Sequence, residues 1–312
     1  MENTMSCDPS YEWTVEEIQE RLGASTVMFP RDRLLQVKDI ARMREIGLRN
    51  IEIIPHAPMM EFKPGHLDFD NRAHIEEIMT ECQRLGVVVA AMHSPNFMYD
   101  SEDENIRKAA VAEAVFVAKV AAEMGAGIFA CHSSLTEHGQ KSVDEMLDEL
   151  EGYSIKIGIE NLDKDLTDYA GFVDKVSSDR VGMIVDIGHR IDDDGVNPFT
   201  EKSRARESMV VCGERLIHLH LHDMDPVMPA VDGDHVTPLD GSIEWGEVFA
   251  ALKDIDYQGL FMFESVFPPG TRERASGYID GIRVESDEYV LRKVGAFAES
   301  FVGKYAKRNC PN

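Results

Sequence analysis

Several predicted strands of this sequence end in residues whose side chains can bind a metal ion. Residues 155–161 (IKIGIEN) form an apolar run closed by Glu160. Residues 181–189 (VGMIVDIGH) form a β-branched run closed by Asp186, with His189 just beyond it. A carboxylate at the point where a buried strand enters a loop is costly unless something positive meets it. A metal ion is one such partner, and a cap on the following helix is the alternative.

The same pattern continues on neighbouring strands. His93 and His132 close the third and fourth predicted strands, Glu264 closes the eighth, and Glu52 lies within the second. In a closed parallel barrel the carboxyl ends of the strands meet at one face, so these side chains are expected to converge. Each of them alone is typical of a hydrogen-bonded core residue. Their recurrence at the same end of successive strands favours a shared site.

The seventh predicted strand reads HLHLHD over residues 218–223. Side chains alternate along a strand, so His218, His220 and His222 share one face. We expect His220 to lie at the depth of the site and His218 to be a buried, hydrogen-bonded residue further down the barrel. Asp223 is expected to be a neighbouring partner that holds an imidazole in one tautomer.

Alternating strand-like and helical segments position these residues. Strands that alternate with helices indicate parallel pairing with right-handed crossovers. Eight such units predict an α/β fold, a (β/α)8 TIM barrel. A doubly wound open sheet is the alternative, but the glycine fingerprint of a dinucleotide site is absent after the first strand. The predicted strands are 24–29, 50–54, 87–92, 127–131, 155–159, 181–185, 216–221 and 259–263.

We expect a single barrel domain over residues 24–305, with an N-terminal extension (1–23) that carries a short helix and a C-terminal tail (306–312). Three long connections follow strands, where barrels build their active face. They are residues 55–70, 222–243 and 264–285. The middle one carries two further candidates, Asp234 and His235, for which an ordinary turn is the alternative.

The composition limits the possible partners. The 312 residues include 32 basic and 57 acidic side chains, a formal net charge of −25 that disfavours binding to nucleic acid or to an anionic membrane. Five dispersed cysteines are typical of reduced thiols, and neither a signal peptide nor a membrane-spanning run is evident. We expect a cytoplasmic protein, and a homo-oligomer stays open.

Taken together, the motifs resemble those of the xylose isomerase-like TIM barrels, from about residue 24 to residue 305. This superfamily contains sugar epimerases and isomerases, inosose dehydratases and endonuclease IV. The resemblance is fairly specific for the superfamily and poorly specific for a substrate. The matching motifs are IEN after the fifth strand, VDIGH after the sixth, HLHD on the seventh, DH…DGSIEW in the next loop and FES after the eighth.

The resemblance implies a divalent metal ion held by Glu160, Asp186, His220 and Glu264, with His189 beside the substrate. It also implies that Glu160 and Glu264 move protons on opposite faces of a sugar carbon. Such oxygen-rich ligation suits Mn²⁺, Mg²⁺ or Co²⁺, and Zn²⁺ stays open. The ion would polarise a carbonyl and stabilise the enediolate formed when the adjacent C–H proton leaves. We therefore expect a metal-dependent isomerase or epimerase that acts on a small-molecule sugar or polyol.

Other functions stay open beside this one. Endonuclease IV uses a larger ligand set for three zinc ions, and four histidines of this chain fall where its extra ligands would. Where that enzyme has an acid two residues before the last of these histidines, this chain has Gly233, with Asp234 adjacent. A dehydratase or lyase on the same site and a non-catalytic barrel subunit are further alternatives. The four histidines are His93, His132, His189 and His235.

Overall fold

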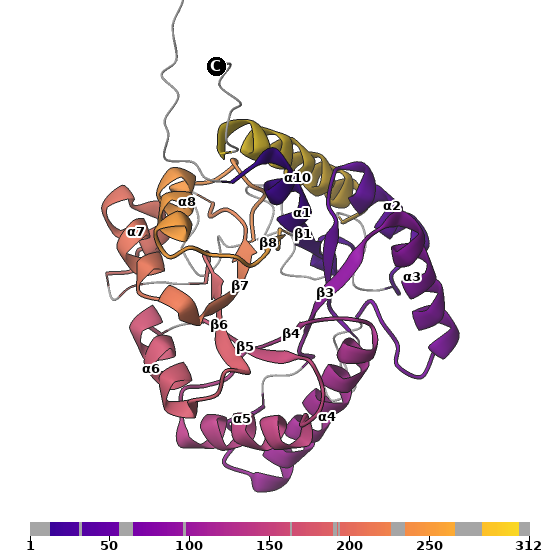
Figure 1. Ribbon diagram of the computed structural model, residues 1–312, viewed down its shortest axis with the longest axis vertical. Helices are drawn as coiled ribbons and strands as arrows, with labels where there is room; N and C mark the ends of the chain where they lie inside the picture. Colours follow the sequence, from indigo (N-terminus) through magenta and orange to yellow (C-terminus); the bar gives the residue numbers. More distant parts are fainter. Residues whose placement is uncertain are drawn as a thin grey trace, which may run out of the picture.

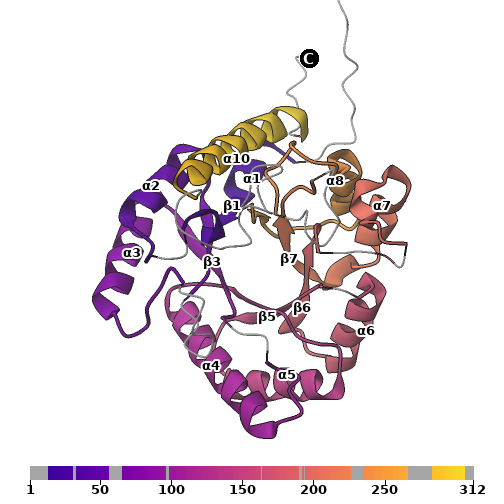
Figure 2. The same cartoon turned by 180° about the vertical axis from the view of Figure 1, so that it is seen from behind.

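The structure, a computed structural model, describes residues 13–305 apart from 31–32, 56–64, 96–97, 163, 190–191, 193, 226–234 and 266–282. Its strands form one closed barrel in chain order, β1 to β8, and β8 pairs in parallel with β1 to complete the ring. Figure 1 shows the strands at the centre with helices around them, and Figure 2 shows the same ring from behind. The predicted single-domain (β/α)8 barrel is confirmed.

The elements follow the predicted order along the chain. The strands are β1 (Leu22–Ser25), β2 (Asn50–Ile53), β3 (Val88–His93), β4 (Ile128–Cys131), β5 (Lys156–Glu160), β6 (Val181–Asp186), β7 (Leu216–Leu221) and β8 (Phe261–Phe263). The helices are α1 (Val15–Arg21), α2 (Val37–Glu45), α3 (Arg72–Leu85), α4 (Glu104–Glu123), α5 (Glu137–Glu149), α6 (Leu166–Val176), α7 (Lys202–Val210), α8 (Trp245–Asp254) and α10 (Arg283–Tyr305).

The first strand differs most from its prediction. Instead of a strand over 24–29, β1 ends at Ser25 and a 3₁₀ turn follows over Thr26–Met28. The Ser25 hydroxyl accepts the backbone N–H of Val27, and the Thr26 hydroxyl accepts that of Ile54. These side-chain hydrogen bonds offer the backbone a turn in place of further sheet pairing.

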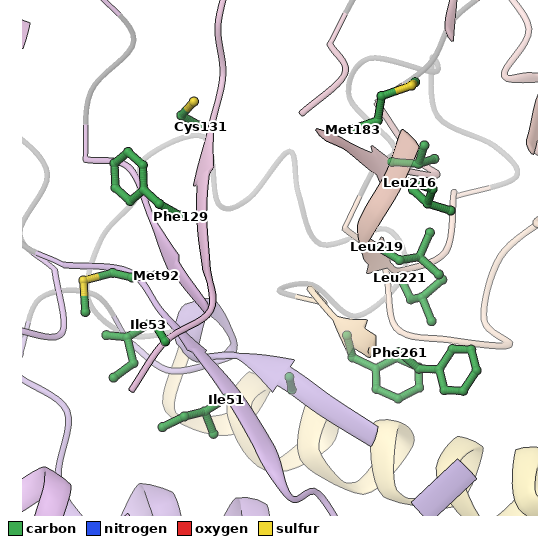
Figure 3. Close-up of a cluster of buried hydrophobic side chains, with 14 of the residues drawn as sticks. Ile51, Ile53, Met92, Phe129, Cys131, Met183, Leu216, Leu219, Leu221 and Phe261 are labelled. Carbon is green, nitrogen blue, oxygen red and sulfur yellow. The ribbon is translucent and has the colours of Figure 1, made fainter. Parts of the chain in front are cut away.

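Strand β7 illustrates how the core and the site share one strand. Leu219 and Leu221 are fully buried and belong to the main apolar cluster, part of which Figure 3 shows. Because successive side chains point to opposite faces of a strand, His218 and His220 face the other way, into the barrel. The apolar residues pack the barrel against its helices, and the histidines remain available to its interior.

Arg21, at the end of α1, ties the start of the chain to the amino end of β8. It donates hydrogen bonds from Nε to the carbonyl of Gly259 and from a terminal nitrogen to that of Tyr257, both at 2.7 Å. Its guanidinium also lies 4.3 Å from the ring centre of Phe261, a favourable cation–π distance.

Among the described residues, no helix combines the length and apolar character that a membrane crossing requires.

Candidate metal centre

Four side chains meet at the carboxyl ends of the strands, each offering a ligand atom within 4.8 Å of the others. Three come from the ends of β5, β6 and β7, and the fourth follows β8 directly. All four are buried, and the most exposed of them is only 4% exposed. Parallel pairing in register brings these strand ends to one face of the barrel. The four residues are Glu160, Asp186, His220 and Glu264.

The donor atoms of this group fit a cation. Oδ2 of Asp186 is buried and, among the described residues, has no hydrogen-bond partner, while Oε2 of Glu264 faces Nδ1 of His220 at 2.8 Å without hydrogen-bonding geometry. Buried polar atoms are almost always satisfied, so the unsatisfied Oδ2 of Asp186 in a cluster of three carboxylates indicates a positive partner. Three carboxylates and one imidazole form a hard, anionic ligand set that suits a divalent ion.

Asp186 is oriented by three hydrogen-bond donors, all of which contact Oδ1 and leave Oδ2 free of them. Oδ1 accepts the backbone N–H of Gly188 at 2.7 Å, that of His189 at 3.0 Å, and Nε2 of His222 at 2.7 Å. The side chain of Asn161 pairs with the backbone of Asp186 on both sides, at 2.7 and 3.0 Å. The carboxylate is therefore fixed with Oδ2 turned to the centre of the group.

His220 is fixed in a similar way. Its Nδ1 lies 3.0 Å from Oε1 of Glu160 and 2.8 Å from Oε2 of Glu264, so this nitrogen faces the ligand cluster. Its Nε2 lies 3.1 Å from Oε2 of Glu52, which also lies 2.9 Å from Nε2 of His218. Glu52, a candidate ligand in the sequence, thus contacts the far side of His220, and His218 is the buried, hydrogen-bonded residue that we expected.

Glu160 also belongs to a second group. Its Oε2 lies 3.1 Å from Nε2 of His93 and 2.8 Å from Nε2 of His132, while its Oε1 faces His220. These two histidines end β3 and follow β4, as the sequence places them. One carboxylate therefore presents one oxygen to each of two clusters of possible ligands.

A third group surrounds Asp186 on the outer side. His189 lies with Nδ1 3.4 Å from Oε1 of Glu160 and Nε2 3.7 Å from Oδ2 of Asp186, and its side chain is 13% exposed. The rings of His222 and His235 stack at 4.3 Å with an angle of 10°. His235 thus joins the cluster, whereas Asp234 lies outside the described residues.

The charges of the group shift its titration strongly. Burial opposes protonation of His220, but Glu264, Glu52 and Glu160 outweigh it and raise the pKa of His220 well above its ordinary value. Burial likewise opposes ionisation of Glu160, yet the facing His132 and His220 lower its pKa well below the ordinary value. A proton on His220 thus partly compensates the acidic cluster, the role that a bound cation would take over.

The pKa values of the three histidines around this group, His93, His132 and His235, shift in different directions. Burial lowers the pKa of His93, but its hydrogen bond to Glu160 and the surrounding carboxylates raise it to about 9. Burial dominates at His132 and lowers its pKa. Burial and the neighbouring His222 lower the pKa of His235 to about 4, so this imidazole is neutral at physiological pH.

Asp223 has a different role from the one we predicted. Among the described residues its carboxylate contacts no imidazole, and it accepts N–H groups of the loop after β7 and of the start of α8, each at 2.9 Å. The donors are the backbone N–H of Met224, Leu239 and Ile243 and the indole of Trp245. The prediction was wrong because nothing in the local spacing indicates which backbone groups of a loop fold back on an acid.

Two residues near the ligands were not assigned a role from the sequence. Asn161, beside Glu160, joins the ends of β5 and β6. His222 was recognised only as part of an alternation, although it contacts Asp186 directly. The regular spacing of histidines on β7 was the available sign for His222.

A protein-family model described as "Xylose isomerase-like TIM barrel" matches residues 40–284 of this chain. An uncharacterized protein of Methanocaldococcus jannaschii is 25% identical over 267 residues, which cover 81% of this chain and 78% of that protein. A D-psicose 3-epimerase of Enterocloster bolteae is 30% identical over 120 residues, 38% of this chain and 32% of the epimerase.

Solved structures resemble the whole barrel. A crystal structure of D-psicose 3-epimerase in the presence of D-fructose has a TM-score of 0.66 and 18% identity, with 91% of this chain and 99% of that one covered. The IOLI protein with a bound zinc atom has a TM-score of 0.67 and 18% identity, with 92% and 100% covered. At this level of identity the likeness concerns the fold.

Proposed function

The chain belongs to the xylose isomerase-like TIM barrel family, and we propose that it is a divalent-metal-dependent isomerase or epimerase of a small sugar or polyol. The observation that carries this proposal is the convergence of Glu160, Asp186, His220 and Glu264, in which the buried Oδ2 of Asp186 has no hydrogen-bond partner among the described residues. The sequence match to a D-psicose 3-epimerase supports the choice of substrate class.

The four residues would hold the ion through Oε1 of Glu160, Oδ2 of Asp186, Nδ1 of His220 and a carboxylate oxygen of Glu264. Oxygen-rich ligation favours Mn²⁺, Mg²⁺ or Co²⁺, and the zinc atom in the related IOLI structure keeps Zn²⁺ a candidate. When bound, the ion supplies a Lewis acid that polarises a substrate carbonyl and its neighbouring hydroxyl.

The chain's own residues supply the proton transfers. Glu160 and Glu264 reach the cluster from β5 and from the end of β8, so they approach a bound substrate from different sides. One carboxylate removes the proton next to the carbonyl, and the other returns a proton to the opposite face. His189, partly exposed beside both Glu160 and Asp186, is placed to hydrogen-bond a substrate hydroxyl.

Replacing each glutamate tests the proposal. Glu160→Gln and Glu264→Gln keep the size of the side chain but remove the proton acceptor, so ketose epimerisation should fall by about 10²–10⁴-fold. The measurement is exchange of the substrate C–H proton with deuterated water, followed by NMR together with the metal content of each variant. The exposed Glu151, in the turn after α5, offers a control as Glu151→Gln. Full activity in both site variants would refute the assignment.

The contacts of His93 and His132 with Glu160 support a second candidate, phosphodiester cleavage of the kind known for endonuclease IV. Counting the ions bound per chain by elemental analysis separates the two functions. Three zinc ions favour phosphodiester cleavage, and a single divalent ion favours sugar chemistry. The net charge of −25 opposes binding of a DNA backbone.

A further inference from the structure

His222 connects the candidate metal centre to the loop that follows β7. It lies directly after β7 and is fully buried. Its Nε2 is 2.7 Å from Oδ1 of Asp186, and the backbone N–H of His235 points to its Nδ1 at 2.8 Å. Both ring nitrogens therefore have partners, one on a proposed metal ligand and one on the loop.

The loop contact fixes the direction of both hydrogen bonds. A backbone amide can only donate, so Nδ1 of His222 must accept from His235 and the ring proton must sit on Nε2. The carbonyl of Asp223 also lies 3.1 Å from Nδ1. It could accept a hydrogen bond only if Nδ1 carried a proton, and that proton would clash with the N–H of His235. Nε2–H therefore donates to Asp186, whose Oδ1 thereby gains a third donor.

The residues next to the His222 ring leave it little room to move. A Cβ at Gly188 would lie 1.8 Å from Cε1 of His222, so only glycine leaves the ring in this place. On its other side the imidazole of His235 stacks almost parallel to it. His235 itself has φ +57°, a left-handed conformation that is costly for a residue with a side chain. The contact is therefore held by backbone conformation as well as by side chains.

We propose that His222 is a positioning residue that couples the loop beginning at His235 to the metal ligand Asp186. The hydrogen bond from His235 selects the tautomer that orients Asp186, and an ordered Asp186 in turn favours the contact between His235 and His222. Coupling of this kind is reciprocal, so binding of an ion should stabilise the loop contact. The proposal rests on the proposed function only in requiring that this centre binds a divalent ion.

Two substitutions separate the two halves of the contact. His222→Gln places an amide nitrogen near the position of Nε2 and keeps the donor to Asp186, while it removes the acceptor for His235. His222→Asn places an oxygen near the position of Nδ1 and keeps the acceptor, while it removes the donor. Exposed His138 on α5 provides the matched control, His138→Gln.

The experiment measures Mn²⁺ affinity by calorimetry and hydrogen exchange of the amides of His235 and Val236 with and without Mn²⁺, with no substrate present. In the unmodified protein and the control, Mn²⁺ should slow exchange of the His235 amide. His222→Asn should bind Mn²⁺ about 10–100-fold more weakly, as expected when a residue that orients a ligand is lost. His222→Gln should bind Mn²⁺ nearly normally but lose the effect of Mn²⁺ on exchange.

Unchanged Mn²⁺ affinity and unchanged metal-dependent protection in both variants would overturn the coupling. If neither variant folds, the unmodified protein alone tests the proposal. A rate of His235 amide exchange that does not change on addition of Mn²⁺ would overturn the coupling as well. Mn²⁺-dependent protection in a protein that turns over no sugar would support the coupling and count against the proposed function alone.

Discussion

The hydrogen-bond partners of each side chain in this centre decide which of its atoms is left for a cation. Glu52 is the clearest case, because it contacts His220 at Nε2, the ring nitrogen that points away from the other proposed ligands. A carboxylate behind a ligating histidine fixes the ring and makes it a better donor. Glu52 is therefore expected to act on metal affinity through His220 without contacting the ion.

Replacing Glu52 tests this role. In Glu52→Gln the amide can present N–H to His220 and so favour the wrong tautomer, and Mn²⁺ should bind about 10–100-fold more weakly. Calorimetric titration with Mn²⁺ measures the change. Glu145→Gln is the control. It removes the ion pair between Glu145 and buried Arg107, neither of which belongs to the proposed centre, and should change the free energy of unfolding without changing Mn²⁺ affinity. Normal affinity in Glu52→Gln would contradict the interpretation.

At the scale of elements, the described part of the segment between β7 and α8 (222–225 and 235–244) is held by contacts with two acidic side chains. Asp223 accepts the backbone N–H groups of Met224, Leu239 and Ile243 and the indole N–H of Trp245 in α8. Asp240 contacts Tyr289 and Lys293 of α10. The segment also contains two residues with positive φ, His235 and Leu239. Such conformations persist where surrounding contacts compensate their cost, which is common beside functional sites.

Leu239 allows this cost to be measured. Its φ is +65° and its side chain is 57% exposed, so a substitution there changes backbone strain more than packing. Leu239→Gly should be more stable than Leu239→Ala by about 1 kcal/mol, because only glycine adopts this conformation freely. Urea unfolding of both variants measures the difference. Equal stability, or a more stable alanine variant, would show that the segment relaxes on substitution.

The strand order and the convergence of the ligands were predictable from the sequence, while the contacts behind the ligands were not. Apolar runs alternating with helical periods specify parallel strands, and parallel strands necessarily bring Glu160 and Asp186 to the same face. By contrast, the acceptor role of Asp223 depends on backbone amides up to Ile243 and on the indole of Trp245, and the role of His222 depends on the backbone of His235. Such partners follow from loop geometry, which residue spacing does not encode.

At the scale of the whole molecule, the barrel surrounds four buried acids, Glu52, Glu160, Asp186 and Glu264. Keeping these charges out of water costs free energy, which their facing histidines offset in part. A cation that binds the folded chain alone shifts the unfolding equilibrium toward the folded state. The centre should therefore contribute to global stability as well as to chemistry.

Removal of metal tests that contribution. Chelation should lower the thermal midpoint, and Mn²⁺ at 100 times its Kd should restore about 2.7 kcal/mol. Differential scanning calorimetry across a series of Mn²⁺ concentrations gives the dependence. Glu264→Gln serves as the comparison, since it removes one of the repelling charges and one ligand, and its midpoint should respond much less to Mn²⁺. A midpoint independent of Mn²⁺ in both proteins would contradict a folding-linked ion.

The two-sided position of Glu160 has an evolutionary consequence. Because one of its oxygens faces His220 and the other faces His93 and His132, an ion at the proposed centre and a second ion beside these two histidines would share this carboxylate, and loss of either histidine would weaken only the second site. The strand, its neighbours and the remaining ligands would stay where they are. On such a scaffold, relatives would differ in the number of bound ions without any change of architecture.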